Sequence, residues 1–403
     1  MHSRRLLRQL PGTGRPTKFT TLGAYMQFSF TDEQEQFRAV VQRFVRDKSP
    51  TSEVRRLMAT EEGFDRGVWQ QLSEALGLPG IHVPETYGGL GFGFVELGIV
   101  MEEMGRSLFC TPYFGSAILA TSAILNGASE AQKLALLPEI SRGDRIASLA
   151  IAEASGSWVA GGIELTASDS DDRYLLNGKK KFVLDGHTAD TIIVVARRPG
   201  SQGEEGVGLF VLDGIAEGLL RQPLETIDAT RKQAELTFDN VAAQPLNEGK
   251  DALAALVKTV DQAAVALANE MVGGAQALLD SAVEYAQLRM QFGRVIGSFQ
   301  AVKHKCADML LDVELAKSAA YYAAQAIAEN DIEAPGLASL AKACAADAYM
   351  RTAAECIQIH GGIGFTWDHD THLWYKRAKS SEVLLGDPSY HRERYMQQLE
   401  AML

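Results

Sequence analysis

The spacing of apolar residues changes twice along this chain of 403 residues, and the change limits the possible folds more than any other feature. From about residue 28 to 140, apolar residues recur every three or four positions, as they do on one face of a helix. One such face consists of Phe37, Val40, Val41 and Phe44. About a hundred residues of short aliphatic segments bounded by Gly and Asp follow, which is typical of strands. Long alanine-rich segments then predict helices up to the C-terminus.

We therefore predict an α+β fold with three domains. An all-helical N-terminal domain spans residues 26–145, a middle β-barrel or β-sandwich domain spans 146–248, and a C-terminal four-helix-bundle domain spans 249–403. The C-terminal helices are too apolar to be exposed rods, so we expect them to be buried partly against another subunit. Residues 1–25 carry five basic side chains and no acid. They are expected to be disordered, a transit peptide, or the product of a mis-assigned start.

Two local signals add detail to this outline. Thr31 precedes a run with Glu residues in its first turns, and it is a good N-cap for the first helix. Asn177-Gly178 lies between two aliphatic segments of the middle domain, where this dipeptide predicts the turn of a β-hairpin.

Composition excludes several classes of function. A formal net charge of -12 repels phosphate backbones, so general nucleic-acid binding is not expected. No apolar run is long enough to span a membrane. The four cysteines form no CxxC pair, which argues against a zinc site or a disulfide framework and favours a reducing compartment. We expect a bacterial cytoplasm, with the mitochondrial matrix as the alternative.

His369 and His372 could share a helix face, but no third ligand follows them at a recognisable metal-site spacing. We therefore predict no metal site and interpret both histidines as surface or interface residues.

Four segments, in order, resemble the acyl-CoA dehydrogenase family of flavoproteins. They are "YGGLGFGFVELGIVMEEMGRS", "YLLNGKKKFVLDGHTADTIIVVAR", "RMQFGRVIGSFQAVKHKCADM" and "QIHGGIGFTWDHDTHLWYKRAK", and the resemblance runs from about Met26 to the end. It implies FAD-dependent α,β-dehydrogenation of an acyl-CoA thioester, in the β-oxidation of fatty acids or steroid side chains. It also implies a tetramer that passes electrons to an electron-transferring flavoprotein.

The resemblance further implies which C-terminal residues hold FAD. These are Arg289, Phe292, Gln300, Gln358, Gly361 and Gly362. The first three would reach the FAD of a neighbouring subunit, where an arginine fork suits phosphate. The others would hold the adenosine–diphosphate portion, where glycines allow close backbone approach. A surface salt bridge for Arg289 and a plain helix C-cap for the two glycines are the purely structural alternatives.

In the middle domain two family motifs are altered. The family's Thr-Glu-Pro-x-Ala-Gly-Ser-Asp corresponds to "AEASGSW", which keeps Ser157 but lacks the threonine, proline and aspartate. The family's Trp-Ile-Thr or Trp-Ile-Ser corresponds to Phe182-Val183-Leu184. Phe182 can still stack beside a flavin ring, whereas Leu184 offers no side-chain donor. Ser157 and Phe182 are the cofactor-binding residues predicted in this domain.

The catalytic base is the main departure from the family. A glutamate at one of two sites removes the α-proton while the β-hydrogen leaves as hydride, and burial raises the pKa of that base toward the working range. In this chain the two sites hold Leu385 and Ala263, and neither side chain can take a proton. Asp261 and Glu270 are the remaining candidates, each also explained by a solvated charge or a structural pair, and Asp387 is a third. The catalytic residue is therefore unknown.

The ending "LLGDPSYHRERY" resembles the small, or β, subunits of bacterial heteromeric acyl-CoA dehydrogenases. There one subunit carries the base and the other completes the shared FAD site. We therefore expect a subunit that completes a shared FAD site with a catalytic partner chain, in a homo- or heterotetramer. The alternatives are a self-sufficient homotetramer with a relocated base, a flavin oxidase or monooxygenase of the same fold, and a chain without flavin.

Overall fold

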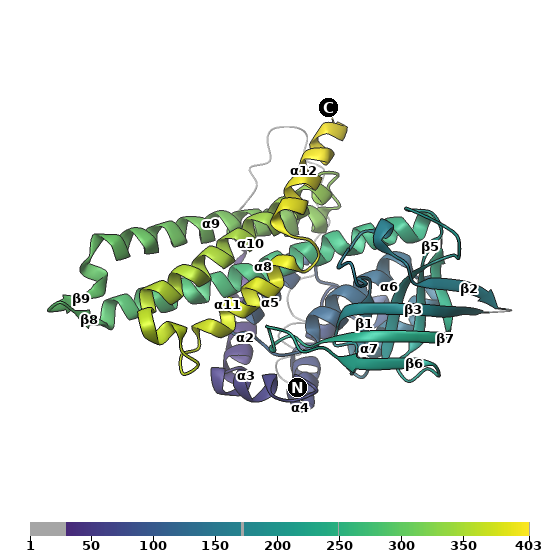
Figure 1. The fold of residues 1–403 in the computed structure, drawn as a ribbon, viewed down its shortest axis with the longest axis horizontal. Coiled ribbons are helices and arrows are strands. Elements are labelled where there is room, and N and C mark those ends of the chain that lie inside the picture. The colour runs from purple at the N-terminus through teal and green to yellow at the C-terminus, as the bar shows by residue number, and fades with distance from the viewer. Residues whose placement is uncertain (1–29, 171–172, 249, 403) are drawn as a thin grey trace.

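The computed structural model describes residues 30–170, 173–248 and 250–402. Within these residues, helices are followed by a sheet and then by helices again, as expected (Figure 1). The expectation for residues 1–25 lies outside the described residues. The predicted domain bounds and the four-helix bundle stay predictions.

The N-terminal part consists of six α-helices and several short helical turns within the described residues. The α-helices are α2 (Asp32–Lys48), α3 (Thr51–Met58), α4 (Arg66–Gln71), α5 (Phe94–Arg106), α6 (Thr121–Gly127) and α7 (Glu130–Ser141). The turns are η1 (Leu72–Leu76), η2 (Leu78–Gly80), η3 (Glu85–Tyr87) and η4 (Phe114–Ala120).

Helix α2 begins where the sequence predicts, but only part of its apolar face is buried. The Thr31 hydroxyl accepts a hydrogen bond from the Gln34 amide at 3.3 Å, which confirms the N-cap. Phe37 and Val41 are buried, whereas Val40 is 41% exposed. Val40 therefore lies at the exposed edge of the apolar face. Helix α2 lies on the outside of α5, where only a narrow stripe of its surface is covered.

The middle part is a mixed sheet of seven strands that are hydrogen-bonded in a closed circuit. The strands are β1 (Ala147–Ala150), β2 (Thr166–Ser170), β3 (Arg173–Leu184), β4 (Thr191–Arg197), β5 (Val207–Asp213), β6 (Leu219–Pro223) and β7 (Gln233–Glu248). The circuit runs β4–β2–β3–β7–β5 and back to β4, with β1 parallel to β4 and β6 added to β7. Because the circuit closes, it forms a barrel whose interior holds aliphatic side chains such as Leu176, Ile192 and Leu236.

The hairpin predicted at Asn177-Gly178 is wrong. Strand β3 runs through this dipeptide and pairs with β7 on both sides of it, with a shift of register at Gly178. The Asn177 side chain accepts a hydrogen bond from the Asn240 amide of β7 at 2.9 Å. The local turn preference is therefore outweighed by pairing with a distant strand, and the glycine forms a bulge instead of a turn.

The C-terminal part is built on long helices. The elements are α8 (Lys250–Leu288), β8 (Met290–Gln291), β9 (Arg294–Val295), η6 (Ile296–Ser298), α9 (Gln300–Glu329), α10 (Ala334–His360), η7 (Gly361–Phe365), α11 (Thr371–Val383) and α12 (Pro388–Met402). Helix α8 extends from the sheet to the small β8–β9 hairpin at the opposite end of the molecule (Figure 1). No described helix is both long and apolar enough to cross a membrane.

Small residues bring α5 and α8 into close contact. A Cβ atom at Gly105 would lie 2.0 Å from the Glu270 carbonyl oxygen, and one at Gly273 would lie 1.8 Å from that of Glu102. Any larger residue would push the two backbones apart, so these glycines set the distance between the helices. This crossing places Glu270 of α8 in the centre of the molecule.

Candidate functional site

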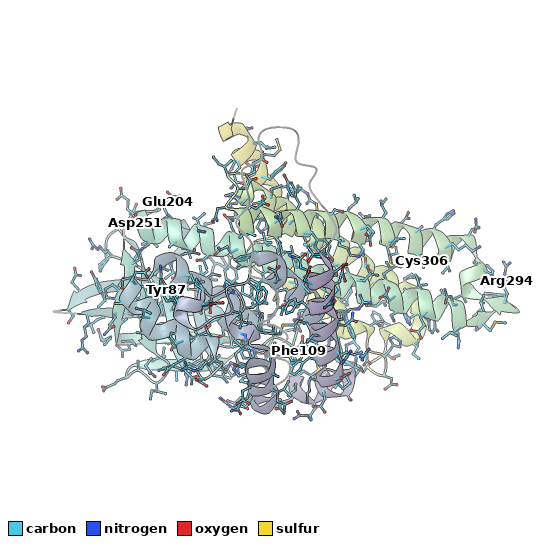
Figure 2. All side chains as sticks on the ribbon, turned by 180° about the vertical axis from the view of Figure 1, so that it is seen from behind. Tyr87, Phe109, Glu204, Asp251, Arg294 and Cys306 are labelled. Atoms are coloured by element: carbon cyan, nitrogen blue, oxygen red, sulfur yellow. The ribbon has the colours of Figure 1, made fainter. Side chains whose placement is uncertain are left out.

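The six C-terminal residues predicted to bind FAD gather at the end of the molecule that carries the β8–β9 hairpin. Arg289 follows α8, Phe292 is 90% exposed in the hairpin, and Gln300 begins α9. Gln358 lies near the end of α10, and the two glycines directly follow that helix. Figure 2 labels Arg294 at this same end. The structure thus brings the two predicted FAD-binding segments together.

Arg289 and Gly362 are both open to an approaching ligand. Within the described part of the chain, no carboxylate lies within ion-pair distance of the exposed Arg289 guanidinium, so the salt-bridge alternative has no support there. Gly361 does cap α10, with φ of 66°. Gly362 has no such role, and a Cβ atom there would meet nothing within 4 Å. Its lack of a side chain leaves room beside the backbone.

The two predicted residues of the middle part lie near the surface of the barrel. Phe182 is 37% exposed and adopts the left-handed conformation, with φ of 58°, at a bulge of β3. Ser157 is half-buried in the loop after β1, and its hydroxyl accepts a bond from the Val159 amide at 3.4 Å. Leu184 is fully buried. The middle part therefore presents an aromatic ring but no hydroxyl at the Phe182-Val183-Leu184 motif.

The two positions predicted to correspond to the family's base are buried and apolar. Ala263, which is part of α8, and Leu385, which lies in the turn between α11 and α12, are both fully buried. Leu385 has φ of 63°, and its carbonyl lies 3.1 Å from Nε2 of His391. A non-glycine residue in this conformation persists only where its surroundings hold it. The turn at Leu385, one of the two predicted base positions, is thus held by the residues around it.

The three remaining carboxylates all have structural partners. Arg394 holds Asp261 with two hydrogen bonds, one of them 2.9 Å long. Burial raises the pKa of Asp261, although the Arg394 guanidinium opposes the rise. Asp387 accepts the Tyr390 amide at 2.8 Å at the start of α12, which is the usual role of an N-cap acid.

Glu270 belongs to a buried charge network that sequence reasoning missed. Arg377 donates to Glu270 at 2.7 Å, to Asp228 at 2.9 Å and to the Thr230 hydroxyl at 2.6 Å. Arg231 also donates to Glu270. We call Asp228, Thr230, Arg231, Glu270 and Arg377 the central network. Its members come from the β6–β7 connection, α8 and α11, and Arg377 is 107 residues from Glu270 and 149 from Asp228. No local spacing could signal such a cluster.

Asp185 adds a third carboxyl group near two guanidinium groups. It is buried, and burial raises its pKa to about 7, although Arg231 and Arg377 pull the pKa down. The two arginines already face Asp228 and Glu270, so a third negative charge would be uncompensated. Asp185 therefore keeps its proton to a higher pH than an exposed aspartate does, while Glu270 lies between Arg231 and Arg377.

The space beside the central network is very small. The cavity there has a volume of about 20 Å³, which is room for roughly one water molecule. It is lined by Thr230, Arg231, Glu270 and Arg377 together with apolar side chains, among them Met101, Met104, Phe109 and Phe114. Figure 2 labels Phe109 near the middle of the molecule, far from Arg294. An acyl chain does not fit into a space of this size.

Comparison with known proteins identifies the family. Models of the N-terminal, middle and C-terminal domains of acyl-CoA dehydrogenases match residues 31–144, 148–241 and 247–400. Acyl-CoA dehydrogenase IpdE2 of Mycobacterium tuberculosis is 32% identical over 89% of this chain and 94% of its own length. The chain belongs to the acyl-CoA dehydrogenase family. Members of this family depend on FAD and are oxidoreductases that act on the CH–CH bond of acyl-CoA.

Solved structures of acyl-CoA dehydrogenases share the fold. Butyryl-CoA dehydrogenase of Megasphaera elsdenii superposes with a TM-score of 0.87 at 27% identity, covering 93% of this chain and 100% of its own. The ChsE4–ChsE5 complex of Mycobacterium tuberculosis contains a chain with a TM-score of 0.83 at 28% identity, covering 93% of this chain and 99% of its own. The three-part organisation of this acyl-CoA dehydrogenase is therefore that of its family.

Proposed function

We propose that this chain is a subunit of an FAD-dependent acyl-CoA dehydrogenase and completes a cofactor site shared with a catalytic partner chain. One observation carries the proposal: Leu385 and Ala263 are buried apolar side chains at the two positions where the family has its base. Without a proton acceptor, the α-proton of a thioester cannot be removed at this chain's own site.

The central network supports the same conclusion. A general base needs a carboxylate whose pKa lies near the working pH and which can reach the substrate. The oxygens of Glu270 instead accept hydrogen bonds from Arg231 and Arg377, so they are not free to reach a substrate. The cavity of about 20 Å³ beside it leaves no space for an acyl chain. A relocated base at Asp261 is disfavoured too, because Arg394 occupies both of its oxygens.

The hairpin end fits a cofactor that is bound mainly by a neighbouring subunit. When bound, FAD would supply the hydride acceptor for the β-hydrogen. The part of this chain would be to bind: Arg289 would neutralise pyrophosphate charge, and the Gly361-Gly362 backbone would lie against the adenosine–diphosphate portion. Phe292, Gln300 and Gln358 would complete the contact. Phe182 and Ser157 would contribute from the middle part.

Similar proteins indicate the class of substrate and partner. One solved relative is a steroid acyl-CoA dehydrogenase, Tcur3481–Tcur3483, with a TM-score of 0.81 at 28% identity. Like the ChsE4–ChsE5 complex, it is named for two proteins. CarC of Acetobacterium woodii, a subunit of a caffeyl-CoA reductase–Etf complex, is 29% identical over 89% of this chain. We infer a bulky acyl-CoA substrate, a heterotetramer, an electron-transferring flavoprotein as acceptor, and the bacterial cytoplasm as its place.

Reconstitution tests the proposal. The pure chain should show almost no acyl-CoA:acceptor activity, and activity should appear when a partner chain with a glutamate at either base site is added. Substantial turnover by the pure chain, lost in Asp261→Asn or Glu270→Gln, would instead establish a self-sufficient enzyme with a relocated base.

A flavin oxidase is the second candidate, because one solved protein of this fold is the prolyl acyl carrier protein oxidase AnaB, with a TM-score of 0.86 at 27% identity. Stopped-flow mixing of the reduced flavoprotein with air separates the two functions. An oxidase reoxidises its flavin within the turnover time, whereas the proposed dehydrogenase needs the electron-transferring flavoprotein.

A further inference from the structure

Helix α3 lies beside the loop that precedes α11 (Figure 1). Val54 and Leu57 of α3 are buried in a small apolar cluster that also contains Leu373 of α11. These contacts hold the helix in place from one side. Arg55 lies between the two apolar residues in the sequence, and its side chain reaches the segment 367–372.

Arg55 binds that segment at several points. Its Nε donates to the Asp370 carboxylate at 2.8 Å, and one terminal nitrogen donates to the carbonyl oxygens of Trp367 at 2.8 Å and His369 at 3.2 Å. The same nitrogen lies 3.4 Å from Nε2 of His372. A planar arginine fork can hold several acceptors in a fixed arrangement, which a lysine cannot do. Arg55 therefore binds the backbone of this loop as well as the Asp370 carboxylate.

The held loop is connected to the glycines at the end of α10. The Thr371 hydroxyl donates to the Gly364 carbonyl at 3.0 Å. The His369 ring lies 4.5 Å from the His360 ring, measured between centroids, and His360 directly precedes Gly361. The position of the loop thus influences the position of Gly361-Gly362.

The same rings connect the glycines to Arg289. The His360 ring stacks on the Tyr285 ring of α8 at 4.3 Å between centroids. The Arg289 amide in turn donates to the Tyr285 carbonyl at 2.8 Å. We call Tyr285, His360 and His369 the ring stack. It joins the end of α8 to the end of α10, which are the two segments that carry the predicted FAD-binding residues.

We propose that Arg55 is a positioning residue for FAD binding, which acts through Asp370 and the ring stack to set Gly361-Gly362 at the right distance from Arg289. This inference rests on the proposed function. It gives a role to the His369–His372 segment, which the predicted chemistry does not use. It also makes the N-terminal helices part of the cofactor site, although Arg55 itself would not touch the cofactor.

The test compares two neighbouring arginines of α3 in the full chain, within the FAD-loaded assembly that it forms. Arg55→Gln and Asp370→Asn each break the proposed connection, whereas Arg56→Gln breaks only ion pairs with Glu53 and Asp65. Arg55 and Asp370 are both 35% exposed, so their pair contributes little to folding and the variants should fold. The FAD dissociation constant is measured from flavin fluorescence, and the thermal midpoint is measured without FAD.

We expect FAD affinity to fall by about tenfold in Arg55→Gln and in Asp370→Asn, as when partners that orient ligand-binding residues are removed. The double variant should be no weaker than either single one, Arg55→Lys should recover part of the loss, and Arg56→Gln should bind like the wild type. Unchanged affinity in Arg55→Gln, or an equal loss in Arg56→Gln, overturns the inference while the proposed function stands. A wild-type assembly without FAD overturns both.

Discussion

The centre and the hairpin end of this molecule show opposite uses of charge. In the centre, Glu270 and Asp228 are paired with Arg231 and Arg377, and the side chains fill the space. At the hairpin end, Arg289 is exposed and Gly362 leaves open space beside the backbone. Charges at the centre are therefore satisfied within the chain, whereas the hairpin end keeps an exposed cation, as the proposed role in binding requires.

The largest expected effect is at the centre. Glu270→Ala leaves two guanidinium groups buried without their shared partner, so we expect the free energy of unfolding to fall by about 3–5 kcal/mol. Urea unfolding followed by circular dichroism measures it. The matched control is Glu62→Ala, which breaks a surface pair with Arg66 and should cost less than about 0.5 kcal/mol. A loss below 1 kcal/mol for Glu270→Ala, on the order of a surface pair, would show that the central network does not stabilise the fold.

Next comes the charge at the hairpin end. Arg289→Gln should weaken FAD binding by about 10–100-fold, because a charge-assisted hydrogen bond contributes about 1.5–3 kcal/mol. Arg294→Gln is the control on the same hairpin, since this guanidinium lies over the Phe299 ring at 4.0 Å. Equilibrium titration of the FAD-free assembly gives both constants. Equal losses in the two variants would mean that general positive charge, and not Arg289, attracts the cofactor.

A smaller effect is the dependence of stability on pH at the centre. The folded-state pKa of Asp185 is raised to about 7 from an ordinary value of 3.8. Between these values the folded chain keeps a proton that the unfolded chain has lost, so stability falls as pH rises from about 4 to 7. Asp185→Asn should remove this fall in stability. At pH 8 its free energy of unfolding should be higher than that of the wild type by roughly 1–3 kcal/mol. If the free energies of unfolding of the two proteins changed with pH in the same way across this range, the raised pKa of Asp185 would be contradicted.

The smallest effect on folding is expected at Gly362. A Cβ atom there meets nothing within 4 Å, so Gly362→Ala should change the unfolding free energy by less than about 0.5 kcal/mol. FAD binding should nevertheless weaken if the backbone lies against the cofactor. Gly361→Ala is the contrasting variant, since the backbone of Gly361, with φ of 66° and ψ of −143°, makes a side chain costly by about 1–3 kcal/mol without any ligand. Wild-type FAD affinity in Gly362→Ala would remove this glycine from the proposed site.

Local sequence patterns predicted the structure correctly where it is decided by residues that are close together along the chain. The Thr31 cap and the order of helices and strands depend on residues a few positions apart, and both are confirmed. Asn177-Gly178 failed as a turn because β7, more than fifty residues away, pairs across it. The spacing of Val40 placed it on the apolar face of α2, but how much of that face is covered depends on α5.

The sequence by itself determined that this acyl-CoA dehydrogenase has no carboxylate at Leu385 or Ala263, because the identity of a side chain needs no coordinates. Only the tertiary structure decided what surrounds these positions. The contacts of Glu270 with Arg231 and Arg377, and those of Arg55 with segment 367–372, are visible only in the folded chain. The physical reason is that ionisation and positioning depend on distances between groups, and folding brings together residues that lie more than a hundred positions apart.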